Sequence, residues 1–386
     1  MENLAKKRKI GTKEEENRER SWDNLPTDIM FMIMKNLYYG DHVRLHVVSK
    51  GWHSMCRVPP RIQEPWLMAF KKNSWTSCKL FDPSYKKTYQ IHIDDAGKGL
   101  LQGKNLKDIK VHSCTYGWFL LSKSNNPVVG DLFVYSPFAN GKIFTLPHLN
   151  SSFQIATFST PLGGRLCVFF TLDAQPDGAT VTITTCTKLD KVWTTNTFEC
   201  KPPVLQNFSN VIYLNGSFYC STPMGTIGIY NITAQHWSVL HLPKPHWSSW
   251  NPDVEQPNGF VDIYMVASRG NILLIYTTER DHHRLSSSPL HYVFRLDRLA
   301  MNWKYMTSLG KKNVLFLGQG GCNVSLVHPK RPGNRIYRCS GYRTRCFDLN
   351  SNKSDPCYNI YGSLSKAKYK KNWIQNPCGI PTCRDY

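Results

Sequence analysis

Hydrophobic residues follow two different patterns along the chain, a short helical one near its start and a long one typical of strands after it. In NLPTDIMFMIMKNL, residues 24–37, apolar residues recur at every fourth position, at Leu25, Ile29, Ile33 and Leu37. This spacing places them on one face of an α-helix. Pro26 suits the first turn of that helix, where its missing N–H is not needed. The sequence therefore predicts an amphipathic helix here.

A second short helix is expected after Gly40, with Asp41 as its N-cap and further apolar residues leading to Trp52. We expect helices to fill residues 21–60, and a linker helix to follow at residues 61–76. The preceding residues 1–20 mix Lys, Arg and Glu with few apolar side chains, which is typical of a disordered charged tail.

From about residue 77 the pattern changes to runs of four to seven apolar and β-branched residues separated by Gly, Pro and Asn. Examples are GWFLLS, RLCVFFTL and NILLIYTT. Such runs with turn residues between them predict short β-strands. We expect one β domain over residues 77–386, so the fold class is mainly β with a small helical segment in front.

A degenerate repeat lies within these strands: an apolar strand, a turn opened by an acidic, amide or hydroxyl residue, and a more polar strand. The turns begin at Asp82, Ser136, Asp190, Asn231, Asp297 and Asp348, in steps of 54, 54, 41, 66 and 51 residues. Each step holds four short strands, which predicts a kelch-like β-propeller of about six four-stranded blades, one of which can close by pairing the two chain ends. Unrelated hairpins in a β-sandwich are the alternative.

Three tryptophans, Trp193, Trp237 and Trp303, follow these turns by three to six residues. A wide ring at this place on an outer strand can pack between neighbouring blades.

Composition places the chain among globular proteins and leaves its partners open. Of its 386 residues 41% are hydrophobic and 12% aromatic, and no apolar run reaches the roughly 18 residues of a membrane span. No secretory signal is recognisable, and the 13 cysteines, an odd number, favour reduced thiols.

The net charge of +21 attracts nucleic acid, acidic proteins or anionic surfaces alike. Without RRM, KH or zinc-finger signatures we expect no direct nucleic-acid contact, and without an apolar run long enough to span a bilayer we expect no membrane partner.

A basic run near the start, Lys6, Lys7, Arg8 and Lys9, fits the acidic groove of a nuclear import receptor. An ordinary solvated basic patch is the alternative, so we expect a nuclear or cytoplasmic protein, or both.

The helical segment resembles an F-box, from Leu25-Pro26-x-Asp28-Ile29 to Val48-Ser49-Lys50-x-Trp52. Three methionines crowd the helix where the family often has Leu or Glu, and Ser49 stands where Cys is frequent. An F-box implies binding to a Skp-type adaptor and, through it, to the cullin and RING subunits of a ubiquitin ligase. The resemblance marks as adaptor contacts, or as the packing behind them, Leu25, Pro26, Ile29, Ile33, Leu37, Val48 and Trp52.

The rest of the chain is similar to plant F-box proteins whose C-terminal half is a degenerate kelch-like domain. The segments that carry this similarity include VIYLNGSFYCSTPMGTIGIYN and FRLDRLAMNWKYMTSLGKKNVLFLG. The resemblance implies a substrate-recognition subunit of an SCF-type ligase, with an unknown protein substrate on the propeller. The alternative is a non-ligase scaffold or interaction protein whose helices pack on its own β domain.

Motifs for chemistry are absent from the sequence: it has no CxxC, HExxH, GxSxG or phosphate-loop motif. We therefore expect no catalytic residues, no metal site and no cofactor. A propeller hydrolase or oxidase with a metal in its channel is the enzyme alternative. For partner binding, the loop 241–259 offers Trp247 and Trp250 as anchors, unless the loop buries its own rings.

Overall fold

The structure is a computed structural model in which two compact units are described. It describes residues 25–45, 48, 52, 64–71, 74–92, 109–115, 117–123, 131–139, 143–159, 167–243, 260–278, 290–318, 320–327, 332–340, 343–351, 353–356 and 369–374. Those up to Trp52 belong to one unit, and those from Glu64 to Ile374 belong to the other. None of the described helices is long and apolar enough to cross a membrane. Residues 1–20 lie outside the described residues.

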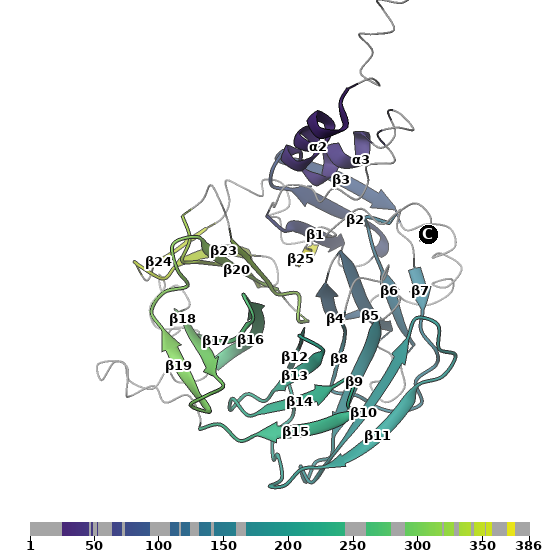
Figure 1. The fold of residues 1–386 in the computed structure, drawn as a ribbon, viewed down its shortest axis with the longest axis vertical. Coiled ribbons are helices and arrows are strands. Elements are labelled where there is room, and N and C mark those ends of the chain that lie inside the picture. Colours follow the sequence, from purple (N-terminus) through teal and green to yellow (C-terminus); the bar gives the residue numbers. More distant parts are fainter. Residues whose placement is uncertain are drawn as a thin grey trace, which may run out of the picture. The chain divides into compact units, whose positions relative to one another are not determined.

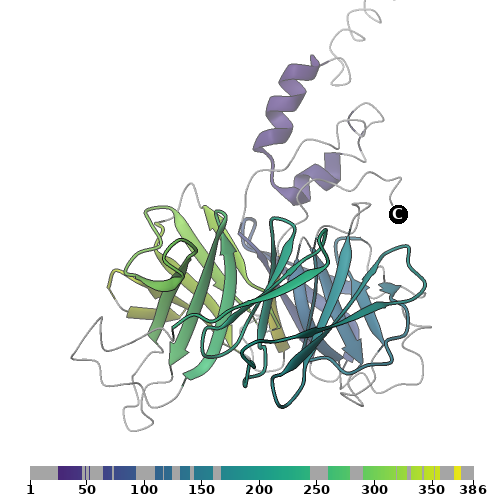
Figure 2. The same cartoon turned by 60° about the horizontal axis from the view of Figure 1, so that its bottom comes forward.

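The first unit contains two short helices joined by a sharp bend, α2 (Thr27–Asn36) and α3 (Tyr39–Leu45) (Figure 2). Pro26 is the N-cap of α2, with no side-chain cap, and the first turn carries an acidic residue while the last carries a basic one, as the helix dipole favours. Asp41 is not the N-cap that we expected: it lies inside the first turn of α3 and forms an ion pair with Arg44 at 2.6 Å.

The described strands of the second unit form six sheets around a common axis, which we number as blades 1 to 6 (Figure 1). Blade 1 contains β25 (Tyr369–Ile374), β1 (Trp66–Lys71), β2 (Ser74–Asp82) and β3 (Lys87–His92). Blade 2 contains β4 (Ile109–Thr115), β5 (Trp118–Lys123), β6 (Leu132–Tyr135) and β7 (Ile143–Thr145). Blade 3 contains β8 (Ile155–Phe158), β9 (Val168–Ala174), β10 (Thr180–Thr187) and β11 (Thr194–Glu199).

The other half of the ring is built in the same way, except in its last blade. Blade 4 contains β12 (Asn210–Leu214), β13 (Ser217–Ser221), β14 (Ile227–Asn231) and β15 (His236–Leu240). Blade 5 contains β16 (Phe260–Ser268), β17 (Asn271–Thr278), β18 (Leu290–Asp297) and β19 (Asn302–Met306). Blade 6 has five strands, in the spatial order β21 (Val324–Val327), β20 (Asn313–Leu317), β22 (Arg335–Ser340), β23 (Arg343–Asp348) and β24 (Lys353–Pro356). The predicted mainly β fold with a six-bladed propeller is confirmed.

Blade 1 closes the ring by pairing the two ends of the unit. β25 runs antiparallel to β1, with Trp66 opposite Ile374, so the expectation that one blade joins the chain ends is confirmed. The linker helix expected over residues 61–76 is wrong, because residues 66–71 form β1 and β2 begins at Ser74. Trp66 to Ala69 at the start of β1 are all apolar and buried, as expected of a strand that is covered on both faces.

Hydrophobic clusters between neighbouring blades hold the ring together. Among the described residues there are six, and they join blades 1 and 2, 2 and 3, 3 and 4, 4 and 5, 5 and 6, and 6 and 1. Alternate residues of one strand enter opposite clusters: in β1, Trp66 and Met68 face blade 2, while Leu67 and Ala69 face blade 6. This is the two-residue period of a strand with both faces buried.

The six turn residues identified in the sequence each open a hairpin in a different blade. In blades 1 to 5 this hairpin joins the third and fourth strands, and in blade 6 it joins the fourth and fifth. Five of these side chains accept a hydrogen bond from a backbone N–H two or three residues further on, and Asp190 accepts one from Thr187. The repeat is therefore a turn stabilised by a side chain that accepts a backbone hydrogen bond, and it occurs once in every blade.

Blade 6 departs from the simple strand order. β20 pairs in parallel with β22, because the chain turns back after β20 to place β21 at the inner edge. The connection between β20 and β21 approaches β4 of blade 2: a Cβ on Gly320, whose φ is +62°, would lie 2.1 Å from the carbonyl oxygen of Val111. Only glycine fits this approach, which brings Cys322 into the cluster between blades 1 and 2.

Candidate functional site

The helix α2 has two apolar faces, of which one is buried and one is exposed. Met30 and Met34, one turn apart, are 2% and 0% exposed. Phe31, Met32 and Ile33 between them are 48%, 57% and 37% exposed. Five consecutive apolar residues cannot all face one side of an α-helix, so burying Met30 and Met34 leaves the other three in solvent.

The residues marked by the F-box resemblance divide between support and exposed surface. Pro26, Ile33 and Val48 are exposed, Val48 to 64%. The half-buried ones are Leu25, Ile29, Leu37 and Trp52. The sequence pattern missed Phe31 and Met32, which are more exposed than Ile33. The signal for them was the uninterrupted run MFMIM, which is wider than a single helix face.

A buried histidine ties α3 to the end of α2. The Nε2 atom of His42 donates a hydrogen bond to the carbonyl oxygen of Met34, which also accepts a bond from the backbone N–H of Leu37. Burial lowers the pKa of His42. The neutral imidazole therefore fixes the angle between the helices and, with it, the exposed row Phe31, Met32 and Ile33.

The propeller unit has two faces that differ in which connections they carry. In blades 1 to 5 the strands run antiparallel from the inner to the outer edge. Turns from the third to the fourth strand therefore share one face, which we call the hairpin face. Connections between blades and turns from the second to the third strand lie on the opposite face, which we call the link face. Trp247 and Trp250 of the segment 241–259 lie outside the described residues, as do Lys6, Lys7, Arg8 and Lys9.

Two histidines in the propeller, the half-buried His112 and the buried His291, contact hydroxyl groups without the geometry of a catalytic site. The Nε2 atom of His112 lies 2.7 Å from Ser122 Oγ, and the Nδ1 atom of His291 lies 3.0 Å from Thr277 Oγ1. Burial, with a nearby cation in each case, lowers the pKa of both imidazoles to about 3. An imidazole with so low a pKa is a poor general base near neutral pH. These pairs satisfy buried polar groups.

The described thiols and acidic residues give no sign of nucleophilic or metal chemistry. Burial raises the pKa of the Cys78 thiol to about 11, which keeps it protonated and unreactive. Across the described ranges, no group of three or more His, Cys, Asp and Glu side chains is arranged to hold a metal ion. Arg338 and Asp262 form an ion pair between blades 6 and 5, where the Arg338 side chain is buried.

Comparison with known proteins assigns both units. The F-box domain matches residues 22–63, and the KIB1-4 beta-propeller matches residues 80–361. The Arabidopsis thaliana F-box/kelch-repeat protein At1g57790 is 28% identical over 308 residues, 78% of each chain. The Arabidopsis F-box protein At3g56470 is 26% identical over 95% of this chain and 92% of its own.

Among solved structures, the crystal structure of Saccharomyces cerevisiae Sqt1 matches at 10% identity and a TM-score of 0.35, over 74% of this chain and 72% of that chain. The fold assignment rests on the six sheets themselves. Because the F-box domain matches in front of the propeller match, and the similar Arabidopsis proteins are F-box proteins, this chain belongs to the plant F-box proteins that carry a KIB1-4 β-propeller.

Proposed function

We propose that this chain is the substrate-recognition subunit of an SCF-type cullin–RING ubiquitin ligase. In this proposal the helical unit binds a Skp-type adaptor, and through it the cullin and RING subunits, while the propeller binds a protein substrate. The chain performs no covalent chemistry itself. It raises the effective concentration of a substrate lysine near the charged ubiquitin carrier.

The observation that carries the proposal is the exposed apolar row on α2. Phe31, Met32 and Ile33 are 48%, 57% and 37% exposed on a helix whose opposite face is already packed by Met30 and Met34. Large apolar side chains gathered in this way mark a protein interface, and methionine adapts well to the shape of a partner. The F-box match covers the same residues.

A pull-down of the purified full-length chain with a Skp-type adaptor tests the proposal. Because Phe31 and Met32 point away from the packed face, the double variant Phe31→Asp with Met32→Asp should keep its helices and lose the adaptor. The matched control is Leu205→Asp, the same kind of change at an exposed leucine of the propeller unit, which should bind as the wild type does. Circular dichroism verifies that each variant is folded.

Either of two results would refute adaptor binding by this row. Wild-type protein that captures no adaptor would leave the helices as part of a non-ligase scaffold. Capture that is unchanged in the double variant would place the contact elsewhere on the chain.

A further inference from the structure

Two hairpins of the propeller hold large aliphatic side chains in solvent. In the turn between β10 and β11, Leu189 is 83% and Val192 is 73% exposed. In the turn between β18 and β19, Leu299 is 98% and Met301 is 43% exposed. Side chains this exposed add almost nothing to the stability of the fold, because they remove little apolar surface from water. We call these two turns the apolar tips.

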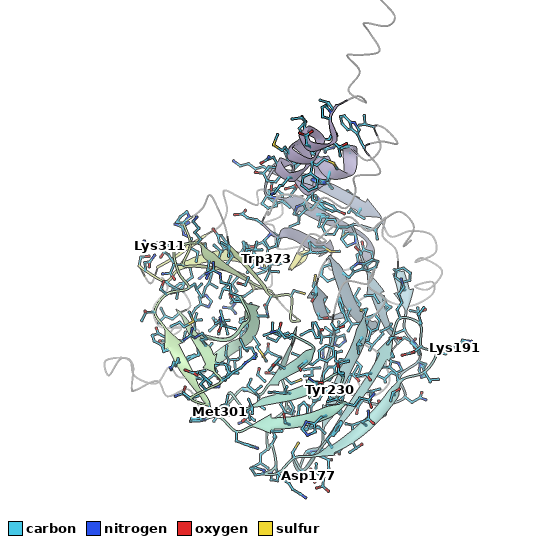
Figure 3. The ribbon with its side chains drawn as sticks, in the orientation of Figure 1. Asp177, Lys191, Tyr230, Met301, Lys311 and Trp373 are labelled. Carbon is cyan, nitrogen blue, oxygen red and sulfur yellow. The ribbon has the colours of Figure 1, made fainter. Side chains whose placement is uncertain are left out.

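Both apolar tips lie on the hairpin face, since each joins the third and fourth strands of its blade. They belong to blades 3 and 5, and blade 4 separates them. The corresponding turn of blade 4 exposes Thr233, Ala234 and Gln235, while its Ile232 packs against the cluster between blades 3 and 4. Figure 3 shows Lys191 of the first tip and Met301 of the second well apart on the ring. The tips therefore share a face without forming one continuous patch.

Each apolar tip is flanked by exposed cations. Lys188 and Lys191 border the first tip and Arg298 the second, and within the described part of the chain none of the three is ion-paired with a carboxylate. The corresponding turn of blade 1 adds the exposed Lys86 and Lys87.

The acidic residues of the same turns are engaged within the turns. Asp190 accepts a hydrogen bond of 2.6 Å from the backbone N–H of Thr187. Asp297 accepts backbone bonds from Leu299 and Ala300 and forms an ion pair with Lys304 at 2.5 Å. Each tip nevertheless carries a net positive charge, because Lys188 and Lys191 outnumber Asp190, and Arg298 and Lys304 outnumber Asp297.

We propose that the hairpin face docks on the surface of an anionic phospholipid bilayer. Leu189, Val192 and Leu299 enter the headgroup region, while Lys188, Lys191 and Arg298 meet the lipid phosphates. Interfacial binding of this kind scales with the apolar area inserted and with the attraction of Lys and Arg side chains to anionic lipid.

The separation of the tips favours a membrane over a protein partner. A stable protein interface needs a continuous packed area of about 800 Å² on each side, with an apolar core. Two apolar tips with blade 4 between them do not provide that core, whereas a flat and fluid surface can receive both at once. The sequence led us to expect no membrane partner because no segment can span a bilayer, but a surface contact needs none.

Co-sedimentation of the full-length chain with vesicles tests this proposal. The vesicles contain phosphatidylcholine alone or phosphatidylcholine with phosphatidylserine. The wild type should bind only the anionic vesicles, and less at high salt because the charges are screened. The triple variant Leu189→Asp, Val192→Asp and Leu299→Asp should bind at least about tenfold more weakly. The charge variant Lys188→Glu with Lys191→Glu should weaken binding without removing an aliphatic side chain.

The matched control is Leu205→Asp, at a leucine that is 79% exposed in the link between β11 and β12, on the link face. It should bind vesicles like the wild type.

No binding of the wild type to anionic vesicles would overturn the proposal, and so would binding that is equal in the triple variant. Capture of polyglutamate without vesicle binding would replace lipid by an acidic protein as the occupant. Adaptor binding plays no part in this assay, so its outcome is independent of the ligase proposal.

Discussion

At the scale of single residues, tryptophan side chains fix neighbouring blades to one another. Trp193 Nε1 donates to the carbonyl oxygen of Pro147 at 2.8 Å, and Trp303 Nε1 donates to that of Gly225 at 2.9 Å. Each bond crosses from one blade to the one before it, and Trp237 packs in the cluster between blades 3 and 4. The prediction that these three rings pack between blades is confirmed. A buried indole provides apolar area and a directed donor together.

Gly228 shows how closely one of these rings is packed. A Cβ at this position would lie 2.0 Å from the Cη2 atom of Trp237. In a strand, replacing glycine by alanine ordinarily stabilises the fold, but here the new Cβ would overlap the ring. Gly228→Ala should therefore lower the free energy of unfolding by about 1–3 kcal/mol. Urea denaturation measures the change. In a Trp237→Leu background the same substitution should cost much less, and an equal cost in both backgrounds would show that the ring is not the cause.

His291 makes the stability of the propeller depend on pH. Its pKa is lowered to about 3 by burial and by Arg338, whereas in the unfolded chain it stays near 6.5. The unfolded state therefore binds a proton that the folded state does not, and stability falls as pH drops from about 6.5 toward 3. At pH 5 the loss is about 2 kcal/mol.

The substitution His291→Asn removes this contribution, because asparagine keeps a polar group near Nδ1 but does not titrate. Urea unfolding at pH 7 and at pH 5 should show the wild type losing about 2 kcal/mol more than the variant between the two conditions. Equal losses in both proteins would mean that His291 is not the group responsible.

At the scale of elements, the turns were more predictable than the strands between them. The six turn residues were found because a side chain that accepts a bond from the backbone acts locally, and local chemistry is visible in sequence. β1 was expected to lie in a linker helix; a short apolar run such as WLMAF occurs both in buried helices and in strands buried on both faces, so its sequence does not decide between them. The order of β20 and β21 depends on contacts of Gly320 with β4, which no local pattern records.

In the candidate site too, the local pattern was visible in the sequence and the effect of distant contacts was not. The period of four identified the helix α2 and the general place of its interface. It did not distinguish Met34, which is fully buried, from Met32, which is 57% exposed, because both are methionines two residues apart. That distinction arises from α3, whose His42 bonds to the carbonyl oxygen of Met34 and fixes which face of α2 is covered.

Alanine at these two methionines should separate packing from surface. Met34→Ala removes a fully buried side chain and should cost about 2–5 kcal/mol, which opens α2 locally. Met32→Ala changes an exposed side chain and should stay within about 0.5 kcal/mol. Hydrogen exchange of the α2 amides in the full-length chain measures both effects. Loss of protection in Met32→Ala, or its retention in Met34→Ala, would contradict the burial described here.

At the scale of the whole molecule, two units carry two kinds of contact. The helical unit holds an exposed apolar row on a helix of ten residues, too short to be stable in water without its packed face. The propeller unit is held by six clusters whose described members all lie between Trp66 and Ile374. Folding of the propeller therefore needs both β1 and β25, which pair at its two ends. The exposed row on α2 belongs to none of the six clusters.

This arrangement predicts that residues 64–376 fold alone. The fragment retains all six clusters, so its thermal midpoint should match that of the propeller transition in the full-length chain. The shorter fragment 64–356 lacks β25, including the buried Trp373 whose Nε1 donates to the carbonyl oxygen of Leu317 at 3.1 Å, and it leaves β1 as an open edge. It should aggregate or unfold at much lower temperature. Failure of the longer fragment would mean that the propeller needs the helical unit, as the scaffold hypothesis requires. Stable folding of the longer fragment leaves the exposed row of α2 available for a second protein.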